Sequence, residues 1–187
     1  PPPPPSGPPP PPPPPGPRGP RNLITDVPGL KVGVAQDSRV RTGATVILPD
    51  SPAMAAVDVR GGGPAPRETD ALGEDNLVQT IDALTFSGGS VYGLAAADGV
   101  AAWLGQQGRG YALRPAPGVP VSPIVPTACL YDLANGGDKN WQLTPPYRQL
   151  GIDAVGKAGL DFPLGTVGAG DGARTGQGQG EGGRGSA

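Results

Sequence analysis

The 187-residue sequence contains no histidine and one cysteine, Cys129. Without histidine, this chain alone cannot build a Ser-His-Asp or Cys-His catalytic arrangement, nor the usual histidine-containing zinc sites. A single cysteine excludes a disulfide within the chain. Cys129 lies in a short apolar run typical of a strand, and we interpret it as a small core residue. Any hydrolytic chemistry must use a base other than imidazole, and we expect no metal and no cofactor.

Aromatic residues are also scarce, at 4%, and no basic excess is present, since the net charge is −2 and the pI is near 5.0. These values give no support to phosphate neutralisation or to base stacking, so nucleic-acid binding is not expected. No apolar run reaches the roughly 18 residues that a membrane-spanning helix needs. The N-terminus also lacks the charged-then-apolar pattern of a secretory signal. We expect a soluble, cytoplasmic protein.

Proline and glycine are abundant instead, and they gather at the two ends. Residues 1–21 form a proline-rich leader, which is expected to be a disordered, polyproline II-like segment. The alternative, a ligand for SH3 or WW-type modules, is less favoured because the run is almost pure proline. Residues 22–187 are expected to form the N-terminal portion of one domain, in which the glycine-rich stretch 165–187 is flexible.

Hydrophobic patterning predicts more strands than helices. Short β-branched or alternating runs predict the strands, and apolar residues at helical spacing predict the helices. Strands are expected on both sides of Pro28-Gly29 and at 44–48, 55–60, 81–86 and 127–131; a helical turn is expected at 76–80 and helices at 91–104 and 150–158. The early strands follow one another without intervening helices, which favours a mainly antiparallel α+β arrangement.

The most informative segment is Thr85-Phe-Ser-Gly-Gly-Ser-Val-Tyr-Gly, where a buried strand is expected to turn sharply into the long helix. Gly88 and Gly89 allow a close approach of the backbone, and Ser90 is placed to cap the helix. Free N–H groups at such a corner suit an anion or a developing oxyanion, so Gly88, Gly89 and Ser90 are candidate substrate-binding residues. A tight packing corner without chemistry would need the same glycines. Tyr92 favours the catalytic interpretation, because its hydroxyl is close enough in sequence to donate at the same place.

Several motifs resemble the L-aminopeptidase/D-esterase family, which also contains β-aminopeptidases and a nylon-oligomer hydrolase. They are Val57-Asp-Val-Arg-Gly-Gly-Gly-Pro, Arg67-Glu-Thr-Asp, Ser87-Gly-Gly-Ser-Val-Tyr-Gly-Leu-Ala-Ala-Ala-Asp-Gly-Val, Val121-Ser-Pro-Ile-Val-Pro, Leu130-Tyr-Asp-Leu, Pro145-Pro-Tyr-Arg-Gln-Leu-Gly and Leu164-Gly-Thr-Val-Gly-Ala-Gly. Their number and order make the resemblance specific from Leu23 to Ala187.

The resemblance implies a layered αββα core of the N-terminal-nucleophile hydrolase type, incomplete in this chain. In such enzymes the precursor cuts itself, and the new N-terminal Ser or Thr of the downstream β-part becomes the nucleophile. Its base is the freed α-amine or a neighbouring group, which accounts for the missing histidine. The implied partners are that β-part, a small peptide, amide or ester substrate, and further copies in a homo-oligomer.

The resemblance also assigns individual residues. Tyr92 matches the family tyrosine that stabilises the oxyanion. Thr166 stands where family members commonly have asparagine, and its hydroxyl is a shorter possible donor. Arg148 falls about where the nylon-oligomer hydrolase has an active-site lysine, although a surface ion pair is the favoured alternative. Apart from the resemblance, Glu68 and Asp70 could pair as carboxylates that hold a substrate amine, although a loop-capping or ion-pair role is favoured. Trp141 is either a cleft residue or a half-buried loop anchor.

Two other functions stay open from the sequence. The chain could be a non-enzymatic interaction protein whose proline-rich tail recruits partners. It could also be a nucleotide-binding module that uses the Gly88-Gly89 corner. The corner fits neither a G-x-G-x-x-G nor a Walker pattern, which disfavours the nucleotide.

Overall fold

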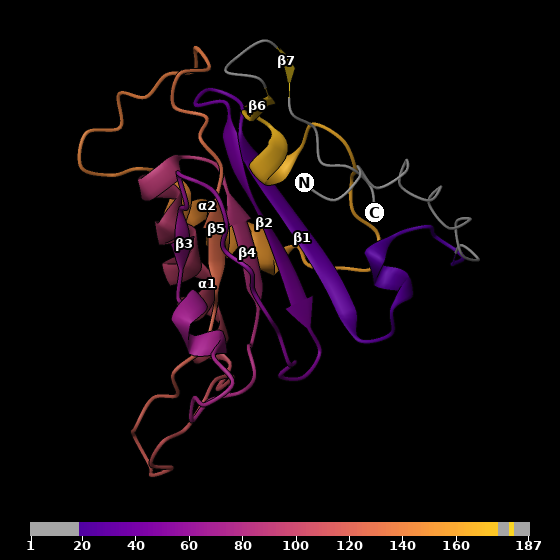
Figure 1. Ribbon diagram of the computed structural model, residues 1–187, viewed down its shortest axis with the longest axis vertical. Coiled ribbons are helices and arrows are strands. Elements are labelled where there is room, and N and C mark those ends of the chain that lie inside the picture. Colours follow the sequence, from indigo (N-terminus) through magenta and orange to yellow (C-terminus); the bar gives the residue numbers. More distant parts are fainter. Residues whose placement is uncertain (1–18, 176–179, 182–187) are drawn as a thin grey trace, which may run out of the picture.

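The computed structural model describes residues 19–175 and 180–181 (Figure 1). Most of the predicted proline-rich leader and much of the glycine-rich end therefore lie outside the described residues. The division into leader and domain stays a prediction.

One five-stranded mixed sheet forms the centre of the described chain, in the order β1-β2-β4-β5-β3. The long strands β1 (Leu30–Asp37) and β2 (Thr42–Pro49) form an antiparallel hairpin, and β4 (Leu84–Ser87) pairs antiparallel with β2. The next strand, β5 (Thr127–Cys129), runs parallel to β4, and β3 (Pro66–Arg67) pairs antiparallel with β5. The expected α+β class is confirmed, with one parallel pair among the antiparallel ones.

Two helices, α1 (Ala96–Gln106) and α2 (Tyr147–Gly156), pack against each other and against one face of the sheet. This face carries the main hydrophobic core, in which Ala44, Val46 and Leu48 of β2 meet both helices. Glycines set the close spacing. A Cβ added at Gly99 of α1 would lie 2.1 Å from a backbone oxygen of α2, so no larger residue fits at this crossing.

The opposite face of the sheet is covered differently. The short 3₁₀ helix η4 (Gly168–Gly170) lies over Thr45, whose Oγ1 accepts the Ala169 N–H at 3.4 Å. Farther along this face the side chains of Leu84 and Phe86 are half-buried. A small separate sheet pairs β6 (Arg174–Thr175) with β7 (Gly180–Glu181). The described chain therefore holds one helix layer and one main sheet of the expected layered core.

Some predicted elements differ from those observed. The predicted helix 91–104 is a 3₁₀ helix, η3 (Ser90–Ala95), that continues into α1. The predicted strand at 55–60 is wrong, because Val57 and Val59 are 48% and 47% exposed and no strand pairs with them. The predicted turn at 76–80 is absent, and a 3₁₀ helix lies earlier, at η2 (Thr69–Leu72). Before Pro28 the chain forms a 3₁₀ helix, η1 (Ile24–Asp26), in place of a strand.

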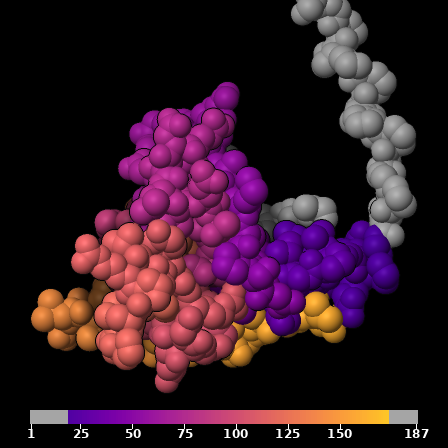
Figure 2. Space-filling view, turned by 90° about the horizontal axis from the view of Figure 1, so that it is seen from below, coloured from indigo at the N-terminus to yellow at the C-terminus, as the bar shows by residue number. Residues whose placement is uncertain are grey.

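The two ends of the sheet have different coverings. At the upper end in Figure 1 lie the β1–β2 turn and the loop that precedes α2. The other end is covered by the loops that follow β3 and α1, which fill much of the face seen from below in Figure 2. Among the described residues, no helix combines the length and apolar character that a bilayer crossing requires. The strand-to-helix corner lies at the upper end, because β4 runs antiparallel to β2 and ends beside the β1–β2 turn.

Candidate active site

The corner between β4 and η3 has a left-handed backbone at two successive residues. Gly89 has φ +83° and Ser90 has φ +53°. Glycine adopts this conformation freely, whereas serine does so at a cost. The predicted cap at Ser90 is wrong in detail, because the N-cap position of η3 is Gly89 and no side chain caps it.

Both glycines of the corner are required by what lies beneath them. A Cβ added at Gly88 would lie 1.9 Å from Oδ2 of Asp132 and 2.3 Å from Oγ1 of Thr42. A Cβ added at Gly89 would lie 2.1 Å from Cζ of Tyr147. The corner therefore rests directly on three polar side chains, and this contact explains the double glycine of the sequence.

Asp132 is the centre of this polar cluster and is only 2% exposed. Its Oδ1 accepts the Gly89 N–H at 2.7 Å, and its Oδ2 accepts the Thr42 hydroxyl at 2.6 Å. A buried carboxylate is costly unless hydrogen bonds replace its lost hydration. Here the replacing donors come from β2 and from the corner itself, so the carboxylate ties the two together.

Burial shifts two neighbouring groups away from ionisation. The phenol of Tyr147, a fully buried side chain, has its pKa raised to about 12, mainly by burial, with Asp132 adding to the effect. Thr42 is near enough to oppose this shift, but within the described residues no hydrogen bond of good geometry reaches the Tyr147 hydroxyl. The pKa of Cys129 is likewise raised to about 12, first by burial and then by Asp132. A thiol held protonated is a poor nucleophile, which agrees with the prediction that Cys129 is not one, although its side chain is half-buried and lies outside the main core.

Tyr92 lies on the outer side of the corner. Its side chain is 46% exposed, and its ring contacts Trp141 edge-on, with 5.4 Å between centroids. Trp141 in turn contacts Tyr147 at 5.8 Å, so three rings lead from the surface to the core. Trp141 fixes one side of the Tyr92 ring while leaving part of the phenol accessible.

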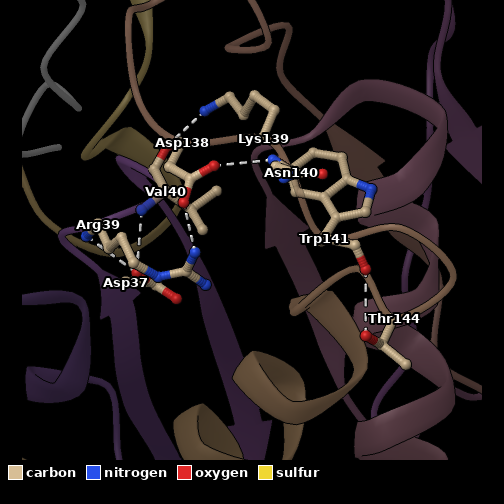
Figure 3. Close-up of polar contacts among 8 residues, drawn as sticks. All are labelled: Asp37, Arg39, Val40, Asp138, Lys139, Asn140, Trp141 and Thr144. Carbon is tan, nitrogen blue, oxygen red and sulfur yellow. Dashed lines mark hydrogen bonds and ion pairs between the residues drawn. The ribbon is translucent and has the colours of Figure 1, made fainter.

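The loop that carries Trp141 is fastened to the β1–β2 turn, as Figure 3 shows. Asp138 pairs with Arg39 at 2.7 Å and accepts the Asn140 N–H at 2.9 Å. These bonds, led by the one from Asn140, lower the pKa of Asp138. The turn itself is held by Asp37, which accepts the N–H of Arg39 at 2.9 Å. These bonds fix the loop in which Trp141 contacts Tyr92. The prediction that Trp141 anchors a loop fits this geometry.

Lys139 is a further charged residue near the cluster. Its ammonium group donates to the Val40 carbonyl and, at 3.0 Å, to Oδ1 of Asn135. Its pKa is lowered, mainly by burial, while the charge of Asp132 opposes the shift. Sequence reasoning missed Lys139 and Asp132. Both lie in recognisable short motifs, Gly137-Asp-Lys-Asn-Trp and Leu130-Tyr-Asp-Leu, but only the fold shows that they flank the corner.

The backbone donors predicted to bind an anion are engaged within the protein. The N–H of Gly88 donates to the Gly43 carbonyl at 2.9 Å, that of Gly89 to Asp132, and that of Ser90 to the Leu130 carbonyl at 2.9 Å. The substrate-binding role of Gly88, Gly89 and Ser90 stays a prediction.

The remaining candidates lie apart from the cluster. Thr166 is exposed in the loop before η4, and no hydrogen bond joins it to Tyr92 in the described chain. Arg148, also exposed, takes part in none of the ion pairs found among residues 19–175. Glu68 accepts the Val125 N–H at 2.9 Å, as a loop-stabilising residue would. The roles predicted for Thr166 and Arg148 stay predictions.

Comparisons with known proteins agree with the fold. An uncharacterized aminopeptidase of Mycobacterium tuberculosis is 46% identical over 163 residues, 83% of this chain and 45% of that protein. A 6-aminohexanoate-oligomer endohydrolase of Kocuria sp. is 32% identical over 165 residues, 85% of this chain and 40% of the relative. The structure of L-aminopeptidase D-Ala-esterase/amidase from Ochrobactrum anthropi, described as a variant of the Ntn hydrolase fold, matches with a TM-score of 0.61 at 20% identity. That match covers 86% of this chain and 46% of the other.

The chain thus spans less than half the length of these relatives. Over that span the fold is that of the Ntn hydrolase variant, and the family resemblance seen in the motifs is confirmed. The model of peptidase family S58 matches residues 22–187, which includes the corner, the polar cluster and the aromatic row. This chain belongs to peptidase family S58.

Proposed function

We propose that this chain is the N-terminal α-part of a self-processing amide hydrolase. Family membership supports hydrolysis, and the similar proteins are named as an aminopeptidase and an oligomer endohydrolase. The nucleophile is a Ser or Thr that self-cleavage exposes at the start of the downstream β-part. The absence of histidine from all 187 residues is consistent with a nucleophile activated by its own α-amine.

One observation carries the proposal: the half-exposed phenol of Tyr92 lies at a strand-to-helix corner. Asp132 and Tyr147 support this corner from beneath, and Trp141 contacts the Tyr92 ring from the side. The side chain of Tyr92 is 46% exposed, and its ring packs edge-on against Trp141 in the described structure. A hydroxyl fixed before the reaction stabilises a developing charge without reorganising, which is the main requirement for an oxyanion donor.

The reaction then proceeds by acyl transfer. The Ser or Thr oxygen attacks the substrate carbonyl while its proton passes to the freed α-amine, and the carbonyl oxygen becomes an oxyanion. Tyr92 donates a hydrogen bond to that oxyanion, with Thr166 as a second donor. Collapse of the intermediate breaks the amide bond, and the protonated α-amine returns its proton to the leaving amine. Water, deprotonated by the same amine, hydrolyses the acyl-enzyme.

The substrate class follows from this chemistry. Small peptides, amides or esters with a free amino group fit the proposal, and Gly88, Gly89, Ser90 and Arg148 are proposed to contact them. The α-part and β-part form one processed pair, and pairs associate into a homo-oligomer in the cytoplasm. No cofactor takes part.

The experiment is to produce the full-length protein, run it on a denaturing gel, and sequence the N-terminus of any fragment. The proposal expects two chains, the second starting with Ser or Thr, and hydrolysis of aminoacyl p-nitroanilides. Replacing that first residue by Ala should leave one uncut, inactive chain. An active protein that stays uncut, or a fragment that starts with another residue type, would contradict the proposal.

A further inference from the structure

We propose that Asp132 is a positioning residue that sets the place of the Tyr92 hydroxyl through the backbone of Gly89. This inference rests on the proposed function, because it concerns how the oxyanion donor is held. Asp132 does not contact the Tyr92 side chain in any hydrogen bond of the described structure, so its action is indirect.

A relay of two hydrogen bonds joins the two residues. Asp132 Oδ1 accepts the Gly89 N–H at 2.7 Å, and the Gly89 carbonyl accepts the Tyr92 N–H at 3.1 Å. The N–H of Gly89 is therefore bound by the Asp132 carboxylate, and the carbonyl group of Gly89 is bound by the N–H of Tyr92. A shift of Asp132 would pass directly to the first turn of η3, where Tyr92 lies.

The other carboxylate oxygen fixes Asp132 itself. Oδ2 accepts the hydroxyl of Thr42, a fully buried residue at the start of β2, at 2.6 Å. The missing Cβ of Gly88 leaves space for this oxygen, since a Cβ there would lie 1.9 Å from it. Asp132 therefore links the corner to the β1–β2 hairpin, whose two strands are the longest of the sheet.

The backbone geometry of the corner shows why these hydrogen bonds are needed. Ser90 lies in the left-handed region at φ +53°, which a serine leaves when nothing holds it. Strained backbone persists only where its surroundings fix it, and such sites cluster where function needs a defined geometry. The Asp132 bond to Gly89, together with the Ser90 N–H bond to the Leu130 carbonyl, supplies that constraint.

A purely structural role would predict a different result, and a matched residue makes the comparison possible. Asp82 is also buried, at 3% exposure, and its Oδ2 accepts a backbone N–H, that of Ile124, at 2.9 Å. Asp82 precedes β4, whereas the corner follows β4. None of the hydrogen bonds found in the described structure joins Asp82 to the corner. Removing either carboxylate should lower stability, but only Asp132 should affect Tyr92.

The test is a double-mutant cycle in the full-length protein with an aminoacyl p-nitroanilide. Asp132→Ala should lower kcat by about 10-fold with KM nearly unchanged, the scale of a misplaced donor. Asp132→Asn, whose amide oxygen can still accept the Gly89 N–H, should restore most of kcat. In a Tyr92→Phe background, Asp132→Ala should cause no further loss, and Asp82→Ala should leave kcat unchanged in both backgrounds.

Should Asp132→Ala fail to fold, Thr42→Val removes the bond to Oδ2 and replaces the alanine variant in the cycle, with a smaller loss of kcat expected. Equal losses in the two Tyr92 backgrounds, or an unchanged kcat in Asp132→Ala or its replacement, would overturn the positioning role alone. An unchanged kcat in Tyr92→Phe itself would overturn the proposed function as well, so the two failures are distinguishable.

Discussion

Replacing Gly89 by Ala tests whether the corner really rests on Tyr147. Gly89 has φ +83°, and a left-handed conformation costs an L-residue about 1–2 kcal/mol. The new Cβ would also lie 2.1 Å from Cζ and 2.5 Å from the hydroxyl oxygen of Tyr147, whose ring is fully buried. Overpacking of this kind costs about 1–3 kcal/mol. The free energy of unfolding should therefore fall by about 2–5 kcal/mol, the sum of both costs.

Gly29→Ala is the matched control. Gly29 has φ +88°, but no atom lies within 4 Å of the position of its Cβ. This variant should lose only the backbone cost of about 1–2 kcal/mol. Urea unfolding followed by circular dichroism measures both variants, and their difference isolates the contact with Tyr147. Equal losses in the two variants would refute the argument, because they would mean that the ring is not fixed beneath the corner.

Three further predictions concern the same framework. Tyr147→Phe removes a buried hydroxyl that has no hydrogen-bond partner within the described residues, so the melting temperature should stay equal or rise; a clear fall would reveal a partner. Asp138 has a lowered pKa, so its stabilising bonds are present above its unfolded pKa and are lost as pH falls through the folded value. Asp138→Asn should therefore flatten the decline of melting temperature below about pH 4, and an unchanged slope would contradict this. In α1, Gly99→Ala should lower the unfolding free energy by about 1–3 kcal/mol and Gly105→Ala should raise it by about 0.5–1 kcal/mol, since only Gly99 abuts another backbone; urea midpoints that move together would count against this packing.

The regular elements with strong periodicity were predictable from the sequence. The β-branched run at 44–48 became the centre of β2, and of the apolar positions predicted to share one helix face, Ala97, Val100 and Leu104 are buried in α1. β2 is buried on both faces, which a continuous apolar and β-branched run records, whereas α1 is buried on one face, which helical spacing records. The 3₁₀ segment that precedes α1 was not predicted; it begins at the left-handed residues Gly89 and Ser90, and hydrophobic spacing does not record backbone conformation.

The predicted strand at 55–60 failed for a physical reason. Alternation at Val57 and Val59 is necessary for a half-buried strand, but a strand also needs a neighbour to share its hydrogen bonds. Only Ala53, before this segment, forms a bridge, with Ile81. Pairing is a property of the fold, so the local pattern was misleading here.

The candidate site, like the fold, was predictable from the sequence only in part. Tyr92 and the double glycine are adjacent in sequence, so their common role could be predicted from one motif. The supports beneath them could not, because Asp132 is 43 residues from Gly89 and 90 residues from Thr42. Only the return of the chain through β5 brings the carboxylate under the corner.

The central claim, that Tyr92 steadies the oxyanion, is tested most directly by kcat. The measurement compares Tyr92→Phe with Tyr131→Phe in the processed protein on an aminoacyl p-nitroanilide. Tyr131 is also exposed, at 65%, but does not share the row of rings formed with Trp141. We predict that Tyr92→Phe lowers kcat by about 10- to 1,000-fold while Tyr131→Phe leaves it unchanged. A Tyr92→Phe enzyme with the kcat of the parent would contradict the account.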